Sequence, residues 1–335
     1  MKSIIILIFM FIFVNLSAKE SKTSELDNSW VLERTNLQYE NDLVFVSDSD
    51  YTSGIKLENI YSIKDVTSPW LKMPFFYDEQ NYHFASIRVS QQIFTPQDIF
   101  SKEIVVDERP YAGWLYIDFG LHESTEDELY SLNLQVGIVG PGSLAEESQK
   151  TVHGTLNLKI PQGWDNQLKN ELGINLILQH KWRLVPEPLY GIESNFMPFV
   201  EVSAGNVKTY ARVGALMRFG INPANDFGSS SIDVGGESGI PTSAGSLLTE
   251  GKDWSFSVNL GLALTVVAHD IFLDGNTFNS SHSIEKEPFV VYASYGLSVR
   301  YKHVAIEYIL TDTTKEFKLQ PRSHEYGSLL FSYIF

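Results

Sequence analysis

The chain has 335 residues, a formal net charge of −16 and no cysteine. The excess of acidic side chains argues against a nucleic-acid partner, because a phosphate backbone binds surfaces that are rich in Lys and Arg. The lack of cysteine excludes disulfides, zinc–thiolate sites and a cysteine nucleophile. The hydrophobic fraction of 43% is ordinary, which excludes a bundle of membrane-spanning helices.

The N-terminus carries the pattern of a secretory signal peptide. Lys2 gives a short basic start, residues 4–14 are wholly apolar, and Ala18 is the small residue that precedes cleavage. This apolar run is shorter than the roughly 20 residues that a spanning helix needs. We therefore predict that residues 1–18 are removed on export and that residues 19–335 form one mature domain.

Twelve extended segments follow, and most of them have the roughly 10 residues that a tilted membrane strand requires. Strands in ordinary sheets average about 5–6 residues. The predicted strands are 34–46, 51–61, 83–94, 111–122, 128–139, 172–184, 195–206, 208–219, 254–268, 288–301, 303–312 and 325–335. The pattern predicts an all-β fold, an antiparallel transmembrane β-barrel of about 12 strands.

Alternation of side chains supports the barrel. In 254–261, Trp, Phe, Val and Leu alternate with Ser, Asn and Gly, and 292–301 alternates in the same way apart from Tyr292. In 329–335 one alternate set is Leu, Phe, Tyr and Phe. Taken alone this last segment would also suit a buried strand of a sandwich. Across the chain, the alternation is what separates a lipid-facing surface from a lumen.

Residues 220–253 do not fit the regular pattern. They are rich in Gly and Ser and show no clear periodicity. Counting strands places them on the periplasmic side, where connections are usually short. Either the strand count is wrong by one hairpin, or this segment is a real excursion.

The first hairpin carries a polar cluster. Asn41 and Asp42 end one strand and Thr52 opens the next, so antiparallel pairing places position 42 opposite position 52. A carboxylate, an amide oxygen, a hydroxyl and the carbonyls near Gly54 then lie together. Oxygen-only ligands of this kind suit calcium.

Two other interpretations of this hairpin stay open. Its Asp and Ser residues are common turn formers, so the cluster could simply be a polar hairpin tip. Asp48 and Asp50 could instead hold the metal, although they lack the loop pattern of an EF-hand.

A second cluster lies after the fifth strand. Ser143 and Glu146 fit a capping box, which predicts that a helix starts there, and Gly154 is a natural stop. Gln149 and His153 are four residues apart and would project from one face of this helix. A histidine held in this way suits general-base catalysis, although it could also be an ordinary exposed side chain.

The entry to the fourth strand carries a third cluster. Arg109 could bind an anionic head group or pair with a nearby carboxylate. Trp114 and Tyr116 could belong to an aromatic girdle at the membrane surface. We predict that residues 161–168 contain a second short helix, in the same loop as His153.

Strand parity brings the three clusters to one place. If the first strand starts in the periplasm, the connections after strands one, three and five all lie outside the cell. The residues that then converge at the outer rim are Asn41, Asp42, Thr52, Arg109, Gln149 and His153.

These residues lie within a series of short motifs. In chain order the motifs are Glu40-Asn41-Asp42, Asp50-Tyr51-Thr52-Ser53-Gly54, Arg109-Pro110-Tyr111-Ala112-Gly113-Trp114, Gly140-Pro141, and Gly163-Trp164-Asp165-Asn166-Gln167. Together they resemble the motifs of the lipid A 3′-O-deacylase family, outer-membrane proteins of Gram-negative bacteria often called LpxR. The resemblance spans most of the mature chain and includes the terminal strand.

The resemblance implies a twelve-stranded barrel, integral to the bacterial outer membrane, with a calcium-dependent esterase site toward the extracellular side. Lipid A, the anchor of lipopolysaccharide, would be the substrate. Carried over by motif, Asp42 would be a calcium ligand, with Asn41 beside it and Thr52 as the site threonine. Gln149 and His153 would be the helix pair, with His153 as the catalytic histidine.

The resemblance also predicts a site lysine soon after the third strand. The nearest candidate is Lys102. We expect Lys102 and Arg109 to be the residues that contact the anionic substrate.

The mechanism expected from these roles is direct attack by water. His153 removes a proton from water, calcium polarises the ester carbonyl, and Gln149 orients the histidine or the substrate. The chain has no Gly-x-Ser-x-Gly motif, which disfavours an acyl-enzyme. The alternatives are an outer-membrane phospholipase of similar chemistry and a non-enzymatic porin or structural barrel. The oligomeric state is left open.

Overall fold

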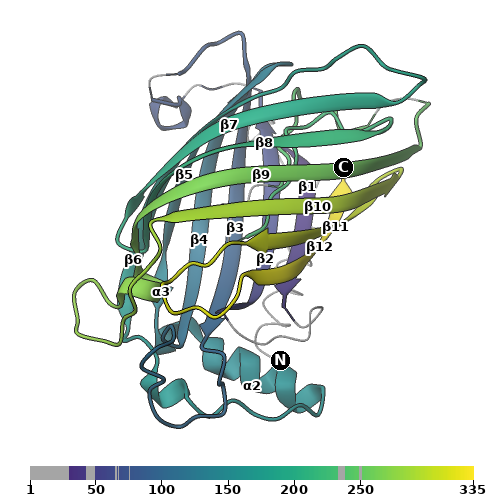
Figure 1. Cartoon of the computed structure of the whole chain (residues 1–335). Coiled ribbons are helices and arrows are strands. Elements are labelled where there is room, and N and C mark those ends of the chain that lie inside the picture. Colours follow the sequence, from purple (N-terminus) through teal and green to yellow (C-terminus); the bar gives the residue numbers. More distant parts are fainter. Residues whose placement is uncertain are drawn as a thin grey trace.

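In the computed structural model, the chain forms a closed cylinder of antiparallel strands (Figure 1). The structure describes residues 30–42, 50–64, 66, 68–74, 76–232, 238–248 and 251–335. The predicted signal peptide, residues 1–18, and Asp48 lie outside these residues. Each strand pairs with its neighbours in sequence, and β1 pairs with β12 to close the barrel.

The described residues form twelve strands, as the sequence predicts. Their bounds are β1 Trp30–Asn41, β2 Asp50–Ile63, β3 Tyr82–Thr95, β4 Ala112–Ser124, β5 Glu128–Val139, β6 Glu171–Trp182, β7 Glu193–Gly205, β8 Lys208–Ile221, β9 Trp254–Asp270, β10 Phe289–Tyr301, β11 Val304–Thr313 and β12 His324–Ile334. The main difference is β1, which begins earlier than predicted because Trp30 pairs with Ile63 of β2.

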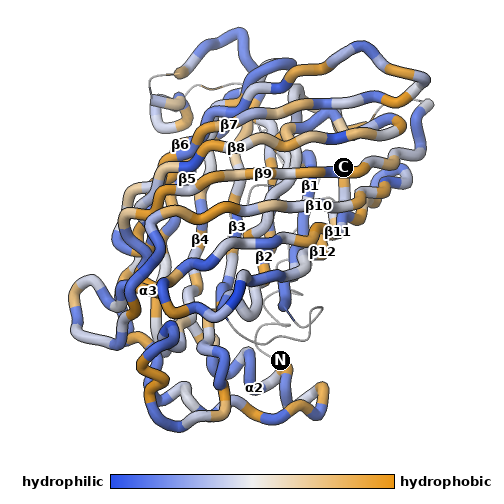
Figure 2. The backbone as a smooth tube through the Cα atoms, viewed as in Figure 1, coloured by the Kyte–Doolittle hydropathy of each residue, from blue (hydrophilic) through white to orange (hydrophobic). Residues whose placement is uncertain are grey.

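The outer wall is apolar and the inner wall is polar. Trp254, Phe256 and Leu260 of β9 are exposed on the outside, whereas Ser255 and Ser257 are buried. Apolar residues recur along the strands of this wall in Figure 2. The alternation in 254–261 therefore separates the two faces as predicted. None of the helices in the described part of the chain is long and apolar enough to cross a membrane.

Charged side chains pair across the inside of β2, β3 and β4. Glu58, Arg88 and Asp118 lie opposite one another in the strand register. Arg88 contacts Glu58 at 3.4 Å and Asp118 at 3.0 Å. Charges can be buried in a lumen only when they are paired in this way.

Part of the connection between β8 and β9 folds back into the lumen. We call its described residues 224–232 and 238–248 the luminal segment. Phe227 and Ile240 of this segment pack in one buried cluster with Ile60, Phe84 and Leu129 of the wall. The irregular stretch at 220–253 is therefore a real excursion, and the strand count stands. Its length is explained by the space that it fills.

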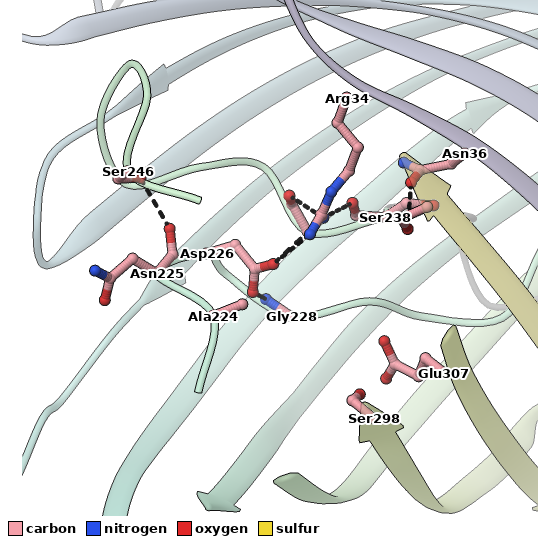
Figure 3. Close-up of polar contacts among 12 residues, drawn as sticks. Arg34, Asn36, Ala224, Asn225, Asp226, Gly228, Ser238, Ser246, Ser298 and Glu307 are labelled. Carbon is pink, nitrogen blue, oxygen red and sulfur yellow. Dashed lines mark hydrogen bonds and ion pairs between the residues drawn. The ribbon is translucent and has the colours of Figure 1, made fainter. Parts of the chain in front are cut away.

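Ion pairs clamp the luminal segment to the wall. The carboxylate of Asp226 accepts a hydrogen bond from Arg34 of β1 at 3.3 Å (Figure 3). It also accepts one from Arg218 of β8 at 2.8 Å. Nη1 of Arg34 also donates to the carbonyls of Ser238 and Gly239, both at 3.0 Å. One carboxylate thus joins two strands on different sides of the barrel to the segment.

Aromatic residues close the lumen at the end opposite Trp30 and the C-terminus. Tyr51, Phe94, Phe272 and Tyr326 belong to one buried cluster there, and the rings of Phe94 and Phe272 stack at 4.0 Å. Trp114 belongs to the same cluster and is only 2% exposed. The prediction that Trp114 and Tyr116 form a girdle is wrong, because both share the luminal face of β4 with Asp118.

Short helices occupy the connections beyond the strands. They are η2 Pro69–Leu71, η3 Pro141–Ser143, α2 Ala145–Thr155, η4 Trp164–Asn166 and α3 Ile271–Asp274. Two helical segments were expected in the loop after β5, and both are present. The predicted capping box is wrong, since Leu144 is the N-cap residue in a left-handed conformation. Ser143 instead donates its hydroxyl to the carbonyl of Gly140, and α2 continues past Gly154.

Candidate active site

The predicted site residues lie at one end of the barrel, opposite Trp30 and the C-terminus, which we call the site end. There β1, β3 and β5 end, and β2, β4 and β6 begin. Helix α2 lies beyond the strands at this end (Figure 1). The six residues expected to converge are therefore on the same side of the molecule, as strand parity predicts. Five of them form two groups, one at the end of β1 and the start of β2 and one on α2, and Arg109 lies in the loop before β4.

The first group, which we call the rim cluster, consists of Asn41, Asp42 and Thr52. The backbone N–H of Asp42 donates to the carbonyl of Thr52 at 3.4 Å, and Nδ2 of Asn41 donates to the same carbonyl at 3.1 Å. Position 42 thus lies opposite position 52, as predicted. All three residues are buried.

Thr52 lies at an irregularity in the pairing of β2 with β3. Tyr51 pairs with Phe94 and Ser53 pairs with Ile93, so Thr52 is the extra residue of a β-bulge. Its hydroxyl hydrogen-bonds the hydroxyl of Thr95 at 2.7 Å. Bulges re-aim side chains at the rims of barrels and beside active sites. The bulge therefore fixes the threonine while bending β2 at the barrel mouth.

Tyr51 and Glu40 support the rim cluster from below. The phenol of Tyr51 donates to Oε2 of Glu40 at 2.7 Å. A Cβ at Gly54 would collide with the Tyr51 hydroxyl, so glycine is needed there. Gly54 was predicted near the metal, which stays a prediction. What the structure adds is that Gly54 makes room for a buried phenol.

The second group, which we call the helix pair, consists of Gln149 and His153. Both lie on the buried face of α2, one turn apart, as the spacing predicts. Oε1 of Gln149 accepts a hydrogen bond from the indole N–H of Trp164 at 2.8 Å. Nδ1 of His153 lies 2.7 Å from the carbonyl of Lys159.

The contact with Lys159 fixes the tautomer of His153. A carbonyl oxygen can only accept a hydrogen bond, so Nδ1 must carry the proton. In the neutral imidazole the lone pair then resides on Nε2. A histidine with this arrangement is able to take a proton at Nε2.

Strands β3 and β4 both contact the segment that holds the helix pair, and β3 also contacts the rim cluster. Nε2 of Gln91 in β3 donates to the carbonyl of Ser143 at 2.6 Å, just before α2. Gly113 of β4 lies so close to Ala145 of α2 that a Cβ there would collide with it. Because Thr95 at the end of β3 bonds Thr52, one strand holds both groups.

Arg109 and Lys102 have different surroundings. Arg109 is almost fully buried, and its Nη1 donates to Glu316 at 3.2 Å. Its guanidinium also lies 5.0 Å from the centroid of the Phe94 ring. Pairing with a carboxylate was one of the two roles expected of Arg109. Lys102 is exposed, and its carbonyl accepts a hydrogen bond from Asn166 at 2.8 Å. Substrate contact by either residue stays a prediction.

Carboxylates near the rim cluster influence one another. Burial raises the pKa of Glu108, the hydrogen bond from the backbone of Gln97 lowers it, and the nearby charge of Asp50 raises it again. The net effect is a raised pKa. Asp50 itself is buried, with His324 3.9 Å away.

The rim cluster offers oxygen donors with one carboxylate. The carboxylate of Asp42, the amide oxygen of Asn41 and the hydroxyl of Thr52 are all hard ligands of the kind that calcium takes. In the part of the chain that the structure describes, no group of three or more His, Cys, Asp and Glu side chains could hold a metal. Calcium accepts neutral oxygens beside a carboxylate, so the chemistry of these rim donors suits calcium, whereas zinc sites are built mainly from Cys and His.

Sequence reasoning missed several residues that hold the site together. Trp164 and Lys159 fix the helix pair, Thr95 fixes Thr52, and Glu40 receives the phenol of Tyr51. Glu40, Tyr51 and Trp164 lie within the motifs quoted above, which was the available signal. Their hydrogen-bond partners could not be read from spacing.

A closed antiparallel barrel with an apolar outer wall and a polar, filled lumen defines the protein as an integral membrane β-barrel. The model of the family described as outer membrane protein LpxR matches residues 4–335. The chain therefore belongs to the LpxR family of outer-membrane proteins.

The chain shares its fold with a solved structure. LpxR from Salmonella typhimurium superposes with a TM-score of 0.73 at 18% identity, covering 90% of this chain and all of that one. The β domain of the Bordetella autotransporter BrkA gives 0.45 at 8% identity, covering 92% of this chain and all of that one. The translocator domain of NalP from Neisseria meningitidis gives 0.40 at 8%, covering 100% and 97%. No curated protein matches the chain.

Proposed function

We propose that this barrel is a lipid A deacylase that hydrolyses the 3′-linked acyl or acyloxyacyl ester, with its site end toward the extracellular side of the outer membrane. The observation that carries the proposal is the geometry of His153. This buried histidine has its tautomer set by the carbonyl of Lys159 and lies at the same end as Asp42. Membership of the LpxR family supports lipid A as the substrate.

The reaction needs one base and one water molecule. Nε2 of His153 removes a proton from water as the oxygen attacks the ester carbonyl. Collapse of the tetrahedral intermediate breaks the bond to the sugar oxygen, which takes the proton back from Nε2. The products are a fatty acid and an alcohol on lipid A. Gln149 is fixed one turn away and orients the histidine or the substrate.

Calcium would be held by Asp42, with Asn41 and Thr52 completing the oxygen set and the carbonyls near Gly54 adjoining it. When bound, it would supply a positive charge that stabilises the developing oxyanion. The hydrogen bond from Asn41 to the carbonyl of Thr52 turns its Nδ2 toward β2 and so orients its amide. This chain thereby presents an oxygen-rich rim at the same end of the barrel as its base.

Two alternatives are less well supported. A porin needs a water-filled lumen, whereas here the aromatic cluster and the luminal segment fill the described interior. A phospholipase of similar chemistry would use the same base and differ in its substrate. Comparing lipid A with a glycerophospholipid in the same assay separates the two enzymes.

The test is mass spectrometry of lipid A incubated with the folded barrel. We expect loss of the 3′ chain, and a decrease of about 10²–10⁴-fold in the rate for His153→Ala. Chelation of calcium should abolish turnover. Unchanged turnover by His153→Ala would show that this histidine is not the base. Activity on phospholipid but not on lipid A would show that the enzyme is a phospholipase.

A further inference from the structure

Glu40 joins the luminal segment to the strands beneath the rim cluster. Its Oε1 accepts hydrogen bonds from the backbone N–H of Ile232 at 2.9 Å and from Nε2 of Gln38 at 3.0 Å. Its Oε2 accepts from the phenol of Tyr51. One buried carboxylate therefore ties together β1, β2 and the segment.

Glu40 and Tyr51 are the immediate supports of the rim cluster. Alternate residues of a strand share a face, so Glu40 and Asp42 are luminal neighbours about 7 Å apart. Tyr51 precedes Thr52 at the bulge, and its carbonyl accepts a hydrogen bond from His324 at 3.1 Å. A shift of either side chain is passed to Asp42 or Thr52 through one or two peptide groups.

The luminal segment makes further contacts at the same level. The hydroxyls of Ser231 and Tyr326 are 2.8 Å apart, and the Tyr326 ring meets the Tyr51 ring edge-on at 5.0 Å. The carbonyl of Ser230 accepts from Gln38 at 3.1 Å. Three consecutive residues of the segment, 230–232, thus contact the side chains that lie beneath the rim cluster.

The other end of this stretch is anchored deep in the lumen. Asp226 is held by Arg34 and Arg218. Its Oδ1 also accepts a hydrogen bond from the backbone N–H of Gly228 at 3.0 Å, and Figure 3 shows this contact beside that of Arg34. Residues 226–232 therefore run from a fixed clamp to Glu40. A short stretch that is held at both ends resists movement of what it touches.

We propose that residues 226–232 of the luminal segment position the rim cluster from inside the barrel, with Glu40 and Tyr51 as positioning residues. This inference rests on the proposed function, because it concerns the same site. It assigns the excursion between β8 and β9 a role in the reaction in addition to filling the lumen.

Tyr51→Phe is the central test, because it removes one hydroxyl and nothing else. We expect kcat on lipid A micelles to fall about tenfold with KM nearly unchanged, since one buried hydrogen bond beneath the rim cluster is lost. We also expect the calcium concentration at which the melting temperature rises to increase about tenfold. Glu40→Gln keeps an acceptor for Ile232 and should lose less, about threefold.

Tyr130→Phe is the matched control. Its phenol donates to Glu128 at 3.0 Å on the outer wall at the opposite end, so the same kind of bond is lost far from the site. This variant should behave as the wild type. Wild-type kcat and calcium response in Tyr51→Phe would overturn the proposal.

An activity-independent measurement separates this inference from the proposed function. Amide exchange of residues 50–54 should accelerate in Tyr51→Phe and in Ile232→Pro, and not in Tyr130→Phe. If the wild-type barrel releases no acyl chain, the proposed function is wrong. The amide-exchange data would still test whether residues 226–232 position the rim cluster. Equal exchange in all variants would overturn the positioning even in an active enzyme.

Discussion

The rim cluster and the helix pair are built in contrasting ways. The rim cluster is part of the β1–β2 ladder and rests on the luminal segment. The helix pair lies on a helix of 11 residues that is fixed by Trp164 and Lys159 from its own loop. A helix of this length is marginal in isolation. The comparison teaches that one part of the site is built into the strand ladder, whereas the other is held by its own loop and by contacts of α2 with β3 and β4.

The largest difference in unfolding free energy between the barrel interior and α2 should come from removing an ion pair in each. Asp226→Ala leaves the guanidiniums of Arg34 and Arg218 buried without their shared carboxylate, which should cost about 3–5 kcal/mol of unfolding free energy. Glu146→Ala removes a partly exposed pair with Lys150 on α2 and should cost less than about 1 kcal/mol. Denaturant unfolding of both variants in lipid vesicles measures the difference. Equal costs would contradict the distinction.

Two glycines give a matched pair of smaller changes. Gly54→Ala places a methyl group against the Tyr51 hydroxyl and should destabilise the barrel by about 1–3 kcal/mol. Around Gly154, in α2, a Cβ would meet nothing within 4 Å. Gly154→Ala should therefore stabilise the helix by about 0.5–1 kcal/mol. Unfolding curves for the barrel and amide exchange for α2 report the two effects, which should have opposite signs.

Trp164→Phe should loosen only the helix pair. The substitution keeps an aromatic ring but removes the N–H that bonds Gln149, a loss of about 1 kcal/mol. Amide exchange in residues 145–155 should rise while exchange in β1 and β2 stays at the wild-type rate. A parallel rise in the strands would show that the two groups are not independent.

The smallest of these effects should be a loss of stability at low pH in the loop that follows β9. Burial by itself raises the pKa of Asp274 in α3, but hydrogen bonds from His269 and Lys286 lower it to about 2. A carboxyl group with a lowered pKa stabilises the folded loop above its ordinary pKa, and this stabilisation is lost as the pH falls through about 2. Pepsin cleavage within 271–288 should therefore accelerate between pH 4 and pH 2. Asp274→Asn should be cleaved rapidly already at pH 4.

Much of the barrel could be predicted because its pattern is local. Alternation has a period of two, so the strands, their number and the lipid-facing set could be read from the chain. The luminal segment could not, since its contacts with Arg34 and Ile60 are remote in sequence and follow no period. Trp114 was misplaced because an aromatic residue suits either face, and only its parity with Asp118 distinguishes them.

The site divides in the same way. Antiparallel pairing placed Asp42 opposite Thr52, and helical spacing placed Gln149 and His153 together. The left-handed Leu144 that starts α2 was missed, because Ser143 and Glu146 have the spacing of a cap without its geometry. Contacts between loops, such as that of Trp164 with Gln149, have no signature along the sequence.

The luminal segment also constrains how the cylinder is sealed. Glu40 of the first strand and Tyr326 of the last both touch it, and these strands meet at the seam, where Asn41 pairs with Gly327. The luminal segment precedes the last strand in the chain. It can therefore contact both β1 and β12 when these two strands pair to close the barrel. Sealing the wall and completing the rim are then one event.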